Sequence, residues 1–255
     1  MGLVLLFLYL PIIVLIVFSF NDSRSRSVWA GFTLDWYVEV FKDSALLNSL
    51  WLTLLVAVVS AVVATIIGTA AAVGLSNFSK MPRNIVMGAN QIPMLNPDIV
   101  TGVSLMLLFV FLHFSMGVGT LILAHITFNI PYVILSVMPR LRQLNPHTFE
   151  AAMDLGAHPV VAFFKVILPE IRPGIVTGLI LAFTLSIDDF MISYFTCGST
   201  AQTLAIYIYS MTRKRVSPKI NAISTLLFLA VLILLIIVNV RSSQIEKKKS
   251  QEMIQ

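Results

Sequence analysis

Residues 50–75 read LWLTLLVAVVSAVVATIIGTAAAVGL and contain no charged side chain. An apolar run of this length crosses a bilayer as a helix, because one span needs about 20 residues. Similar runs on both sides of it predict six spans, at approximately 3–20, 50–75, 85–112, 119–138, 174–195 and 220–240. The sequence therefore predicts an all-α, polytopic membrane protein with six transmembrane helices.

The composition of the whole chain agrees with this class. Of the 255 residues, 58% are hydrophobic and 11% are charged, and the mean hydropathy is +0.92, which excludes a water-soluble enzyme. The runs are apolar on every face, whereas the strands of a membrane β-barrel alternate between apolar and polar residues. A β-barrel is therefore excluded. The single cysteine, Cys197, excludes an intramolecular disulfide and a cysteine-based metal site.

The basic residues lie mostly at the ends of the spans. Lys and Arg number ten in segments 76–84, 139–173 and 241–255 and seven on the other side. This bias predicts that both termini are cytoplasmic, although the cluster at 213–215 opposes it. We therefore expect the basic residues behind the net charge of +5 to set the topology and to contact anionic lipid of the bilayer. We expect no nucleic-acid partner. The first span lacks a basic n-region and a cleavage site, so we expect a retained anchor.

Three smaller patterns concern packing. Ala64, Gly68 and Ala72 recur every fourth residue, which predicts close approach of another helix. Segment 21–49 mixes aromatic and charged residues and predicts a short amphipathic piece at the outer interface. His125, inside the fourth span, is interpreted as an interhelical hydrogen-bonding residue and not as a ligand.

Residues 139–173 are long for a connector and contain two sets of helix signals. Asn145 is a good N-cap, Pro146 suits the first helical position, and Gly156 suits the left-handed residue that follows a helix. A second short helix, Val160 to Leu168, is expected to start after Pro159 and to end at Pro169. That helix exposes an apolar surface, so we expect it to need a partner.

The order Glu150-Ala151-Ala152, Gly156 and Leu168-Pro169 resembles the EAA loop of ABC-importer permeases, whose consensus is E-A-A-x3-G-x9-I-x-L-P. Valine replaces the consensus isoleucine at position 166. The resemblance implies that these residues belong to a coupling helix that docks onto a separate ATP-hydrolysing subunit. The alternative is an ordinary helical loop packed on its own bundle.

The same resemblance implies the fold of a type I ABC importer permease. Residues 1–255 would then form a single permease domain, and 139–173 its cytoplasmic coupling loop. No G-x-x-x-x-G-K-[ST] motif occurs, so ATP and Mg must be bound by partner ATPase subunits. No H-E-x-x-H or G-x-S-x-G occurs either. We expect a permease subunit and not an enzyme, with no catalytic residue, metal site or cofactor of its own.

Asp98, Asp188 and Asp189 are the only acidic residues well inside the predicted spans. An unpaired charge there costs about 2.5–3.5 kcal/mol on insertion scales. Asp98 and Asp188 each lie 14 residues from the cytoplasmic end of their spans, about 21 Å along a helix. We expect them to share one depth and to form part of a ring that receives a cation.

These acids also have structural interpretations. Asn96, Pro97 and Asp98 fit a broken helix that restarts, with Asn96 as N-cap and Asp98 complementing the helix dipole. Asp188 and Asp189 could pair with a basic residue of a neighbouring subunit. Adjacent residues point about 100° apart on a helix, so we expect only one of these two to face the path.

Several stretches are similar to polyamine-importer permeases of the PotC type, and the similarity extends over nearly the whole chain. These stretches are LPII at 10–13, SFN at 19–21, NPDIV at 96–100, SIDDF at 186–190, IY at 206–207 and SPKINA at 217–222. The basic N-terminal lead of that type is missing, so we expect a shortened start.

This resemblance implies spermidine or putrescine as cargo. It implies as partners a homologous B-type permease, two ATP-binding subunits and an extracytoplasmic polyamine-binding protein, in a bacterial plasma (inner) membrane. Tyr194 offers an aromatic face near the outer end, so the expected substrate path comprises Asp98, Asp188, Asp189 and Tyr194. The alternatives are an importer for another organic or metal cation, and a secondary, ion-coupled transporter.

Overall fold

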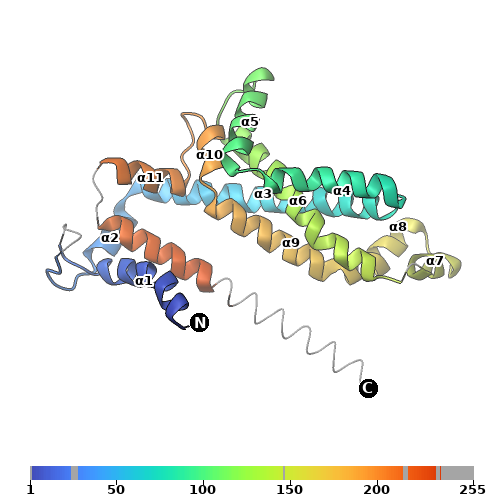
Figure 1. Ribbon diagram of the computed structural model, residues 1–255, viewed down its shortest axis with the longest axis horizontal. Helices are drawn as coiled ribbons and strands as arrows, with labels where there is room; N and C mark the ends of the chain where they lie inside the picture. Colours follow the sequence, from blue (N-terminus) through green and yellow to red (C-terminus); the bar gives the residue numbers. More distant parts are fainter. Residues whose placement is uncertain (1, 24–27, 146, 215–217, 234–235, 237–255) are drawn as a thin grey trace. The chain divides into compact units, whose positions relative to one another are not determined.

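The computed structural model is an assembly of helices (Figure 1). It describes residues 2–23, 28–145, 147–214, 218–233 and 236. In these ranges the only extended pairing is an isolated bridge between Asn21 and Phe32, and the predicted all-α class is confirmed. The helices are α1 (Gly2–Phe18), α2 (Asp35–Lys42), α3 (Ser44–Ser76), α4 (Lys80–Leu95), α5 (Asp98–Phe111), α6 (Val118–Gln143), α7 (His147–Asp154), α8 (Pro159–Ala162), a π-helical segment (Phe163–Ile167), α9 (Leu168–Asp188), α10 (Met191–Thr196), α11 (Leu204–Lys214) and an unlabelled helix (Lys219–Ile233).

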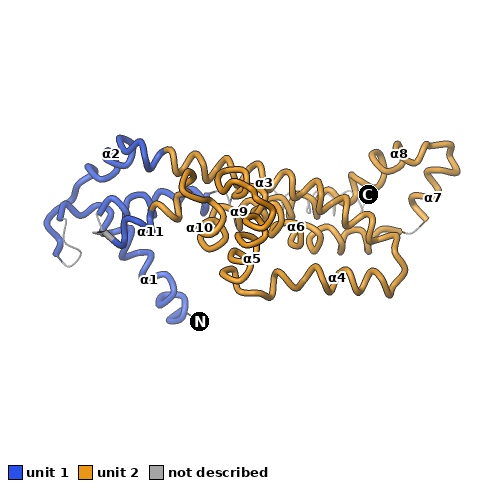
Figure 2. The backbone as a smooth tube through the Cα atoms, turned by 90° about the horizontal axis from the view of Figure 1, so that it is seen from above, with its two compact units in different colours: residues 1–47, 208–255 blue, residues 48–207 orange. Residues whose placement is uncertain are grey.

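The chain divides into two compact units, which Figure 2 colours separately. Unit 1 comprises Met1–Leu47 with Ile208–Gln255, and unit 2 comprises Asn48–Tyr207. All the residues predicted for coupling and for the substrate path lie in unit 2. The prediction that residues 1–255 form a single permease domain stays a prediction.

Three helices are long and apolar enough to cross a membrane, namely Ser44–Ser76, Val118–Gln143 and Pro159–Asp188. They contain the predicted spans 50–75 and 119–138 entirely, so the prediction of a helical membrane protein is confirmed. The first and sixth predicted spans correspond to the shorter apolar helices Gly2–Phe18 and Lys219–Ile233. Of the sixth predicted span, residues 234–235 and 237–240 lie outside the described residues, as does the tail 241–255. The count of six spans stays a prediction.

Two predicted spans are wrong as single helices. The span 85–112 consists of α4 and α5, which are bent by 104° at a short break. Pro97 causes this break, because a proline disfavours the helical conformation of the residue before it. The span 174–195 ends its helix at Asp188, and the chain turns before α10 begins at Met191.

Small residues bring α6 and α9 together, and Figure 1 shows the two helices side by side. On α9 every fourth residue is small and buried: Gly174, Gly178, Ala182 and Ser186. A Cβ atom added at Gly174 would lie 2.9 Å from the backbone oxygen of Ser136. Because lipid is as apolar as the side chains, such close contact is what stabilises helix pairs in a bilayer.

The predicted close approach to α3 is confirmed. Ala64 and Ala72 are fully buried, and a Cβ atom added at Gly68 would lie 2.8 Å from Cβ of Val133 on α6. A Cβ atom added at Gly74, six residues farther along α3, would have no neighbouring atom within 4 Å. The stripe of Ala64, Gly68 and Ala72 therefore packs within the chain along its whole length, whereas Gly74 lies on an exposed face of α3.

Unit 1 has its own contacts. The Trp36 indole of α2 is buried and donates a hydrogen bond of 2.8 Å to the backbone oxygen of Asn21. Lys219 Nζ donates to Asp43 Oδ2 at 2.6 Å, which joins the start of the last described helix to the residue before α3. The segment 21–49 thus contains a short amphipathic helix, as predicted, and its Trp36 is buried within unit 1.

Candidate functional site

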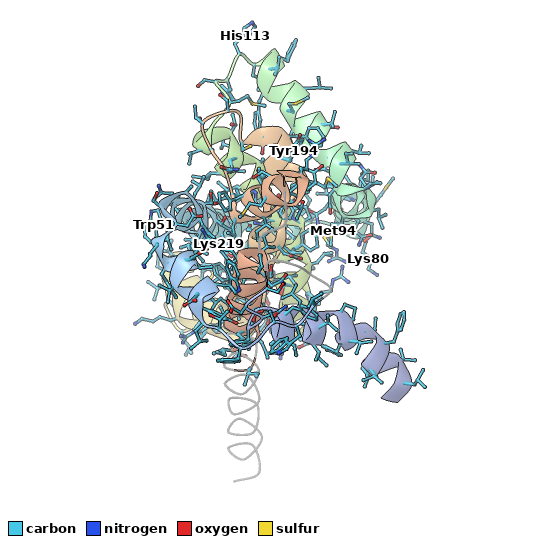
Figure 3. The ribbon with its side chains drawn as sticks, turned by 90° about the vertical axis from the view of Figure 1, so that its left-hand side faces the viewer. Trp51, Lys80, Met94, His113, Tyr194 and Lys219 are labelled. Carbon is cyan, nitrogen blue, oxygen red and sulfur yellow. The ribbon has the colours of Figure 1, made fainter. Side chains whose placement is uncertain are left out.

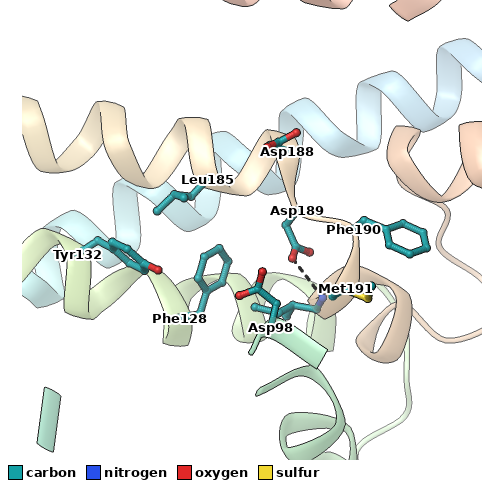
Figure 4. A pocket seen from close by; sticks show the side chains of 9 residues that line it. Asp98, Phe128, Tyr132, Leu185, Asp188, Asp189, Phe190 and Met191 are labelled. Atoms are coloured by element: carbon teal, nitrogen blue, oxygen red, sulfur yellow. Dashed lines mark hydrogen bonds between the residues drawn. The ribbon is translucent and has the colours of Figure 1, made fainter. Parts of the chain in front are cut away.

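The three predicted acids line one cavity of unit 2. The cavity has a volume of about 320 Å³ and lies where the start of α5, one face of α6, the end of α9 and the start of α10 meet (Figure 4). It is lined by Asp98, Phe128, Tyr132, Leu185, Asp188, Asp189, Phe190, Met191 and Ile192. Helix packing thus brings together acidic residues that are 90 positions apart in the chain.

Asp98 lies at the point where the chain bends. Asn96 is extended, with φ −73° and ψ 143°, and ends α4, while Pro97 precedes the first residue of α5. The predicted break is confirmed, but Asn96 is not the N-cap, and no side chain caps α5. The depth counted along one straight helix does not apply to Asp98. Its exposed carboxylate lies in the first turn of α5, where the helix dipole favours a negative charge.

Asp189 is held by the chain itself. Its Oδ1 accepts the N–H of Ile192 at 3.2 Å and its Oδ2 accepts the N–H of Ser193 at 2.7 Å. These are two of the N–H groups that the first turn of a helix leaves without intrahelical partners. Oδ2 also lies 3.5 Å from Nε2 of His125, and the Asp189 side chain is only 7% exposed. Asp189 therefore starts α10 and contacts α6.

Asp188 has different surroundings from its neighbour. It is the last residue of α9, and its side chain is exposed at the cavity. Within the part of the chain that the structure describes, no hydrogen bond or ion pair reaches its carboxylate. The C-terminal end of a helix carries a partial negative charge, so a carboxylate is unfavourable there unless a cation lies nearby.

Hydrogen bonds between helices surround the cavity. His125 Nε2 lies 3.0 Å from Oγ of Ser193, so the predicted interhelical role of His125 is confirmed. One turn farther along α6, Asn129 Nδ2 donates to Oγ of Ser186 at 2.8 Å, and that oxygen lies 3.1 Å from Oγ of Ser60. All five side chains are buried. They connect α3, α6, α9 and α10 around the cavity.

Sequence reasoning missed the aromatic wall of the cavity. Phe128 and Tyr132 are four residues apart on α6 and therefore lie on the same face of the helix. Tyr132 is also close enough to Asp98 for the two groups to interact electrostatically. The four-residue spacing was visible in the sequence, but α6 is apolar on several faces and nothing marked this one.

Tyr194 does not line this cavity. It lies on α10 with an exposed side chain (Figure 3). Its ring contacts Phe190 and Phe195, each at a centroid distance of 5.5 Å. The structure therefore brings together three of the four residues predicted for the substrate path.

The first helix of the predicted coupling loop forms as expected. Asn145 Oδ1 accepts the N–H of His147 at 3.0 Å, and its backbone oxygen accepts the N–H of Thr148 at 3.0 Å, so Asn145 caps the start of α7. Pro146, predicted as the first helical residue, lies outside the described residues. Glu150 Oε2 is 3.0 Å from Nδ1 of His147, and both side chains are exposed.

Gly156 ends α7 in the predicted left-handed conformation, with φ +85°. Its N–H donates to the backbone oxygen of Met153 at 2.8 Å, and the N–H of Ala157 donates to that of Ala152 at 3.1 Å. This pair of hydrogen bonds is a Schellman motif, which satisfies the last carbonyl groups of a helix. Glycine adopts the left-handed conformation without steric cost, so Gly156 fixes the turn between α7 and α8.

The second helix of the predicted coupling loop begins as predicted but does not end at Pro169. Pro159 is its first residue, and α8, the π-helical segment and α9 make one continuous helix, Pro159–Asp188. In the π-helical segment the N–H of Leu168 bonds to the backbone oxygen of Phe163, one residue farther back than in an α-helix. This local widening accommodates the proline ring, which otherwise clashes with the carbonyl four residues before it.

The predicted coupling loop exposes apolar side chains, as expected. Leu155 is 89% exposed and Phe164 59%. Val160 and Val161 are exposed, whereas Ile167 and Leu168 pack against the core of unit 2. Ala151 and Pro169 are exposed and Ala152 is half-buried. The loop is thus anchored on one side and leaves an apolar surface uncovered on the other.

Two regions of unit 2 are joined by α9. Figures 1 and 2 both show α7 and α8 at one end of the unit and α5 and α10 nearer the other. The distance along the helix from Pro169 to Asp188 is about 30 Å at 1.5 Å per residue, which equals the thickness of a bilayer core. Among the described residues, no group of three or more His, Cys, Asp or Glu side chains is arranged to hold a metal ion.

Comparison with known proteins gives relatives over most of the chain. Residues 64–250 match the family described as "Binding-protein-dependent transport system inner membrane component". The chain is 42% identical over 237 residues to the putrescine transport system permease protein PotI of Escherichia coli (strain K12). This match covers 88% of this chain and 83% of PotI. It is 40% identical over 230 residues to the spermidine/putrescine transport system permease protein PotC of the same strain, covering 90% and 87% of the two chains.

A solved structure has the same fold. A chain of a bacterial ABC transporter involved in the import of the acidic polysaccharide alginate matches with a TM-score of 0.73. The match covers 93% of this chain and 92% of that chain at 16% sequence identity. At this identity the likeness concerns the fold alone.

Proposed function

This chain belongs to the family of binding-protein-dependent transport system inner membrane components, and we propose that it lines the pore through which an ATP-driven importer moves polyamines into the cytoplasm. The resemblance to ABC-importer permeases is thereby confirmed, and the chain is a multi-pass membrane permease subunit. The names of its relatives PotI and PotC support putrescine or spermidine as the cargo.

The observation that supports this cargo best is the position of Asp188. Its carboxylate faces the cavity from the C-terminal end of α9 with no compensating donor from any described residue. In a membrane protein such a charge needs a partner, and a cation that enters the cavity supplies one. Asp98, at the start of α5, adds a second carboxylate to the lining of the cavity. Asp189 has its donors already and keeps α10 in place.

The remaining partners follow from the family. We propose that the pore is completed by a homologous B-type permease, that two ATP-binding subunits hold ATP and Mg, and that an extracytoplasmic polyamine-binding protein delivers the cargo. The exposed apolar surface of α7 and α8 supports docking of an ATP-binding subunit, with Glu150 and Gly156 in the contact region. This assignment puts the coupling loop and both termini on the cytoplasmic side of a bacterial plasma membrane.

The test is transport by the complete importer in sealed vesicles that contain ATP. We expect uptake of radiolabelled putrescine or spermidine that needs both ATP and the binding protein, and no uptake of arginine or Mg²⁺. Uptake of one of those two cations instead would contradict the polyamine assignment. Uptake that continues without ATP but stops when the ion gradient is removed would show a secondary transporter.

A further inference from the structure

Phe128 and Tyr132 form a fixed aromatic wall beside the acids. Their ring centroids are 6.4 Å apart with an interplanar angle of 85°. The Phe128 ring also lies edge-on to the His125 imidazole, at 5.5 Å and 70°. His125 is fully buried and hydrogen-bonded to Ser193. Tyr132 thus packs against Phe128 and Phe128 against His125, and the His125 ring is fixed by its hydrogen bond to Ser193.

The wall and the acids meet in the same space. Asp98, Asp188, Phe128 and Tyr132 line one cavity, and Figure 4 shows the Phe128 ring between Tyr132 and Asp98 in that view. Leu185 adds an apolar side chain. The cavity thus combines carboxylates with ring faces, and these two kinds of group suit different parts of an alkyl ammonium ion. An ammonium group is attracted by a carboxylate and by the negative face of a ring, and its methylene chain packs on apolar surface.

A metal cation fits this lining poorly. Mg²⁺ and Ca²⁺ take six or more oxygen ligands, and they prefer carboxylates, carbonyls and water. Of the three acids here, Asp189 is already bonded to Ile192 and Ser193. Two open carboxylates and two aromatic rings remain, which is a better match to an organic ammonium group.

We propose that Phe128 and Tyr132 form a cation–π subsite with Asp98 and Asp188, and that this subsite holds one ammonium end of an alkyl amine during passage. The proposal rests on the polyamine function given above and names the residues that select an alkyl ammonium ion over other cations. In this role the rings hold the methylene chain and the charged end in line, while the carboxylates balance the charge.

The test uses the complete importer in vesicles, with putrescine-loaded binding protein added over a range of concentrations up to saturation. Phe128→Leu and Tyr132→Leu should each lower the putrescine uptake rate about three- to tenfold, as expected for a cation–π contact. The concentration of loaded binding protein that gives half-maximal uptake should stay at the parental value, because docking lies outside the cavity. ATP hydrolysis stimulated by the binding protein should also persist. Tyr132→Phe keeps the ring and should lose less uptake than Tyr132→Leu.

A control variant and an isosteric series separate this role from a structural one. Phe111→Leu removes an exposed ring of α5 that does not line the cavity and should transport at the parental rate. Stepwise fluorination of the Phe128 ring keeps its shape and weakens its negative face, so uptake should fall with each fluorine.

Three outcomes would overturn the proposal. Parental uptake in both leucine variants would exclude the aromatic role while leaving the polyamine function intact. A uniform loss of uptake, ATP hydrolysis and assembly, with no dependence on fluorination, would show that the rings only support the fold. A parent importer that carries no polyamine would refute the proposed function, and the subsite falls with it.

Discussion

The carboxylate of Asp189 accepts the backbone N–H of Ser193 at 2.7 Å, and this bond begins a new helix directly after Asp188 has ended the previous one. Two adjacent acids therefore meet different surroundings. Asp189 is nearly buried and bonded, whereas Asp188 is exposed at the cavity. The first three predictions separate passage of the cargo from support of the fold.

Asp188→Asn should lower polyamine uptake about tenfold without lowering assembly. The substitution removes a charge that no described residue compensates, so the fold loses nothing while the cation loses a partner. Uptake and the amount of assembled complex are measured in the same vesicles. Glu39→Gln, which alters an exposed acid of α2, is the matched control. Parental uptake by the Asp188 variant would show that the acid is structural.

Asp189→Ala should destabilise the protein by about 1–2 kcal/mol, because two N–H groups at the start of α10 lose their acceptor. Asp189→Asn keeps one of the two acceptor oxygens and should recover only part of this loss. Asp188→Ala, at the neighbouring position, should cost much less. Thermal unfolding in detergent gives the comparison, and equal losses at the two positions would contradict the assignment.

Asp98→Asn tests the two interpretations of that residue. A charge in the first turn of a helix contributes only about 0.3–1 kcal/mol, so assembly should remain close to parental. Uptake should fall severalfold, because Asp98 lines the cavity with Asp188. If assembly falls in proportion to uptake, the role of Asp98 is restricted to the start of α5.

Gly68→Ala should destabilise the packing of α3 on α6. The new methyl group would lie 2.8 Å from Cβ of Val133, a buried atom of a β-branched residue that has no room to move. We expect a loss of about 1–3 kcal/mol. Gly74→Ala is the control on the same helix, since its methyl group meets nothing within 4 Å and alanine favours the helix. Equal thermal stability of the two variants would contradict this packing.

Gly156→Ala should weaken docking of the ATP-binding subunit. The residue has φ +85°, and an L side chain pays about 1–2 kcal/mol in the left-handed conformation, so the turn between α7 and α8 should shift. The expected result is weaker pull-down of the ATP-binding subunit, with membrane insertion unchanged. Leu155→Ala, beside it, keeps the turn and reports the apolar contact alone. Parental pull-down by both variants would contradict the coupling assignment.

Local signals predicted much of the fold. The uncharged run 50–75, the cap at Asn145 and the left-handed Gly156 depend on a few neighbouring residues, and all three are confirmed. The sequence also indicated the break at Pro97, yet the run 85–112 was interpreted as one span because hydropathy does not register a change of direction. A bend of 104° follows from backbone geometry that apolar composition cannot reveal.

The less predictable parts depend on contacts between distant segments. Pro169 is typical of a helix end, and only the widened π-helical turn before it lets the helix continue. The different surroundings of Asp188 and Asp189 depend on where α9 stops and on the position of His125. Phe128 and Tyr132 become cavity residues because α9 and α10 pack against one particular face of α6.

The π-helical segment Phe163–Ile167 also sets a rotational phase. Each residue of an α-helix advances about 100° around the axis, so one residue more or less turns everything beyond it by that angle. Pro159–Asp188 is a single helix, so it fixes the angle around its axis between the exposed side of α8 and the side that carries Gly174, Gly178 and Asp188. Deleting one residue from 163–167 would leave both ends helical, yet it would turn the docking surface out of alignment with the cavity.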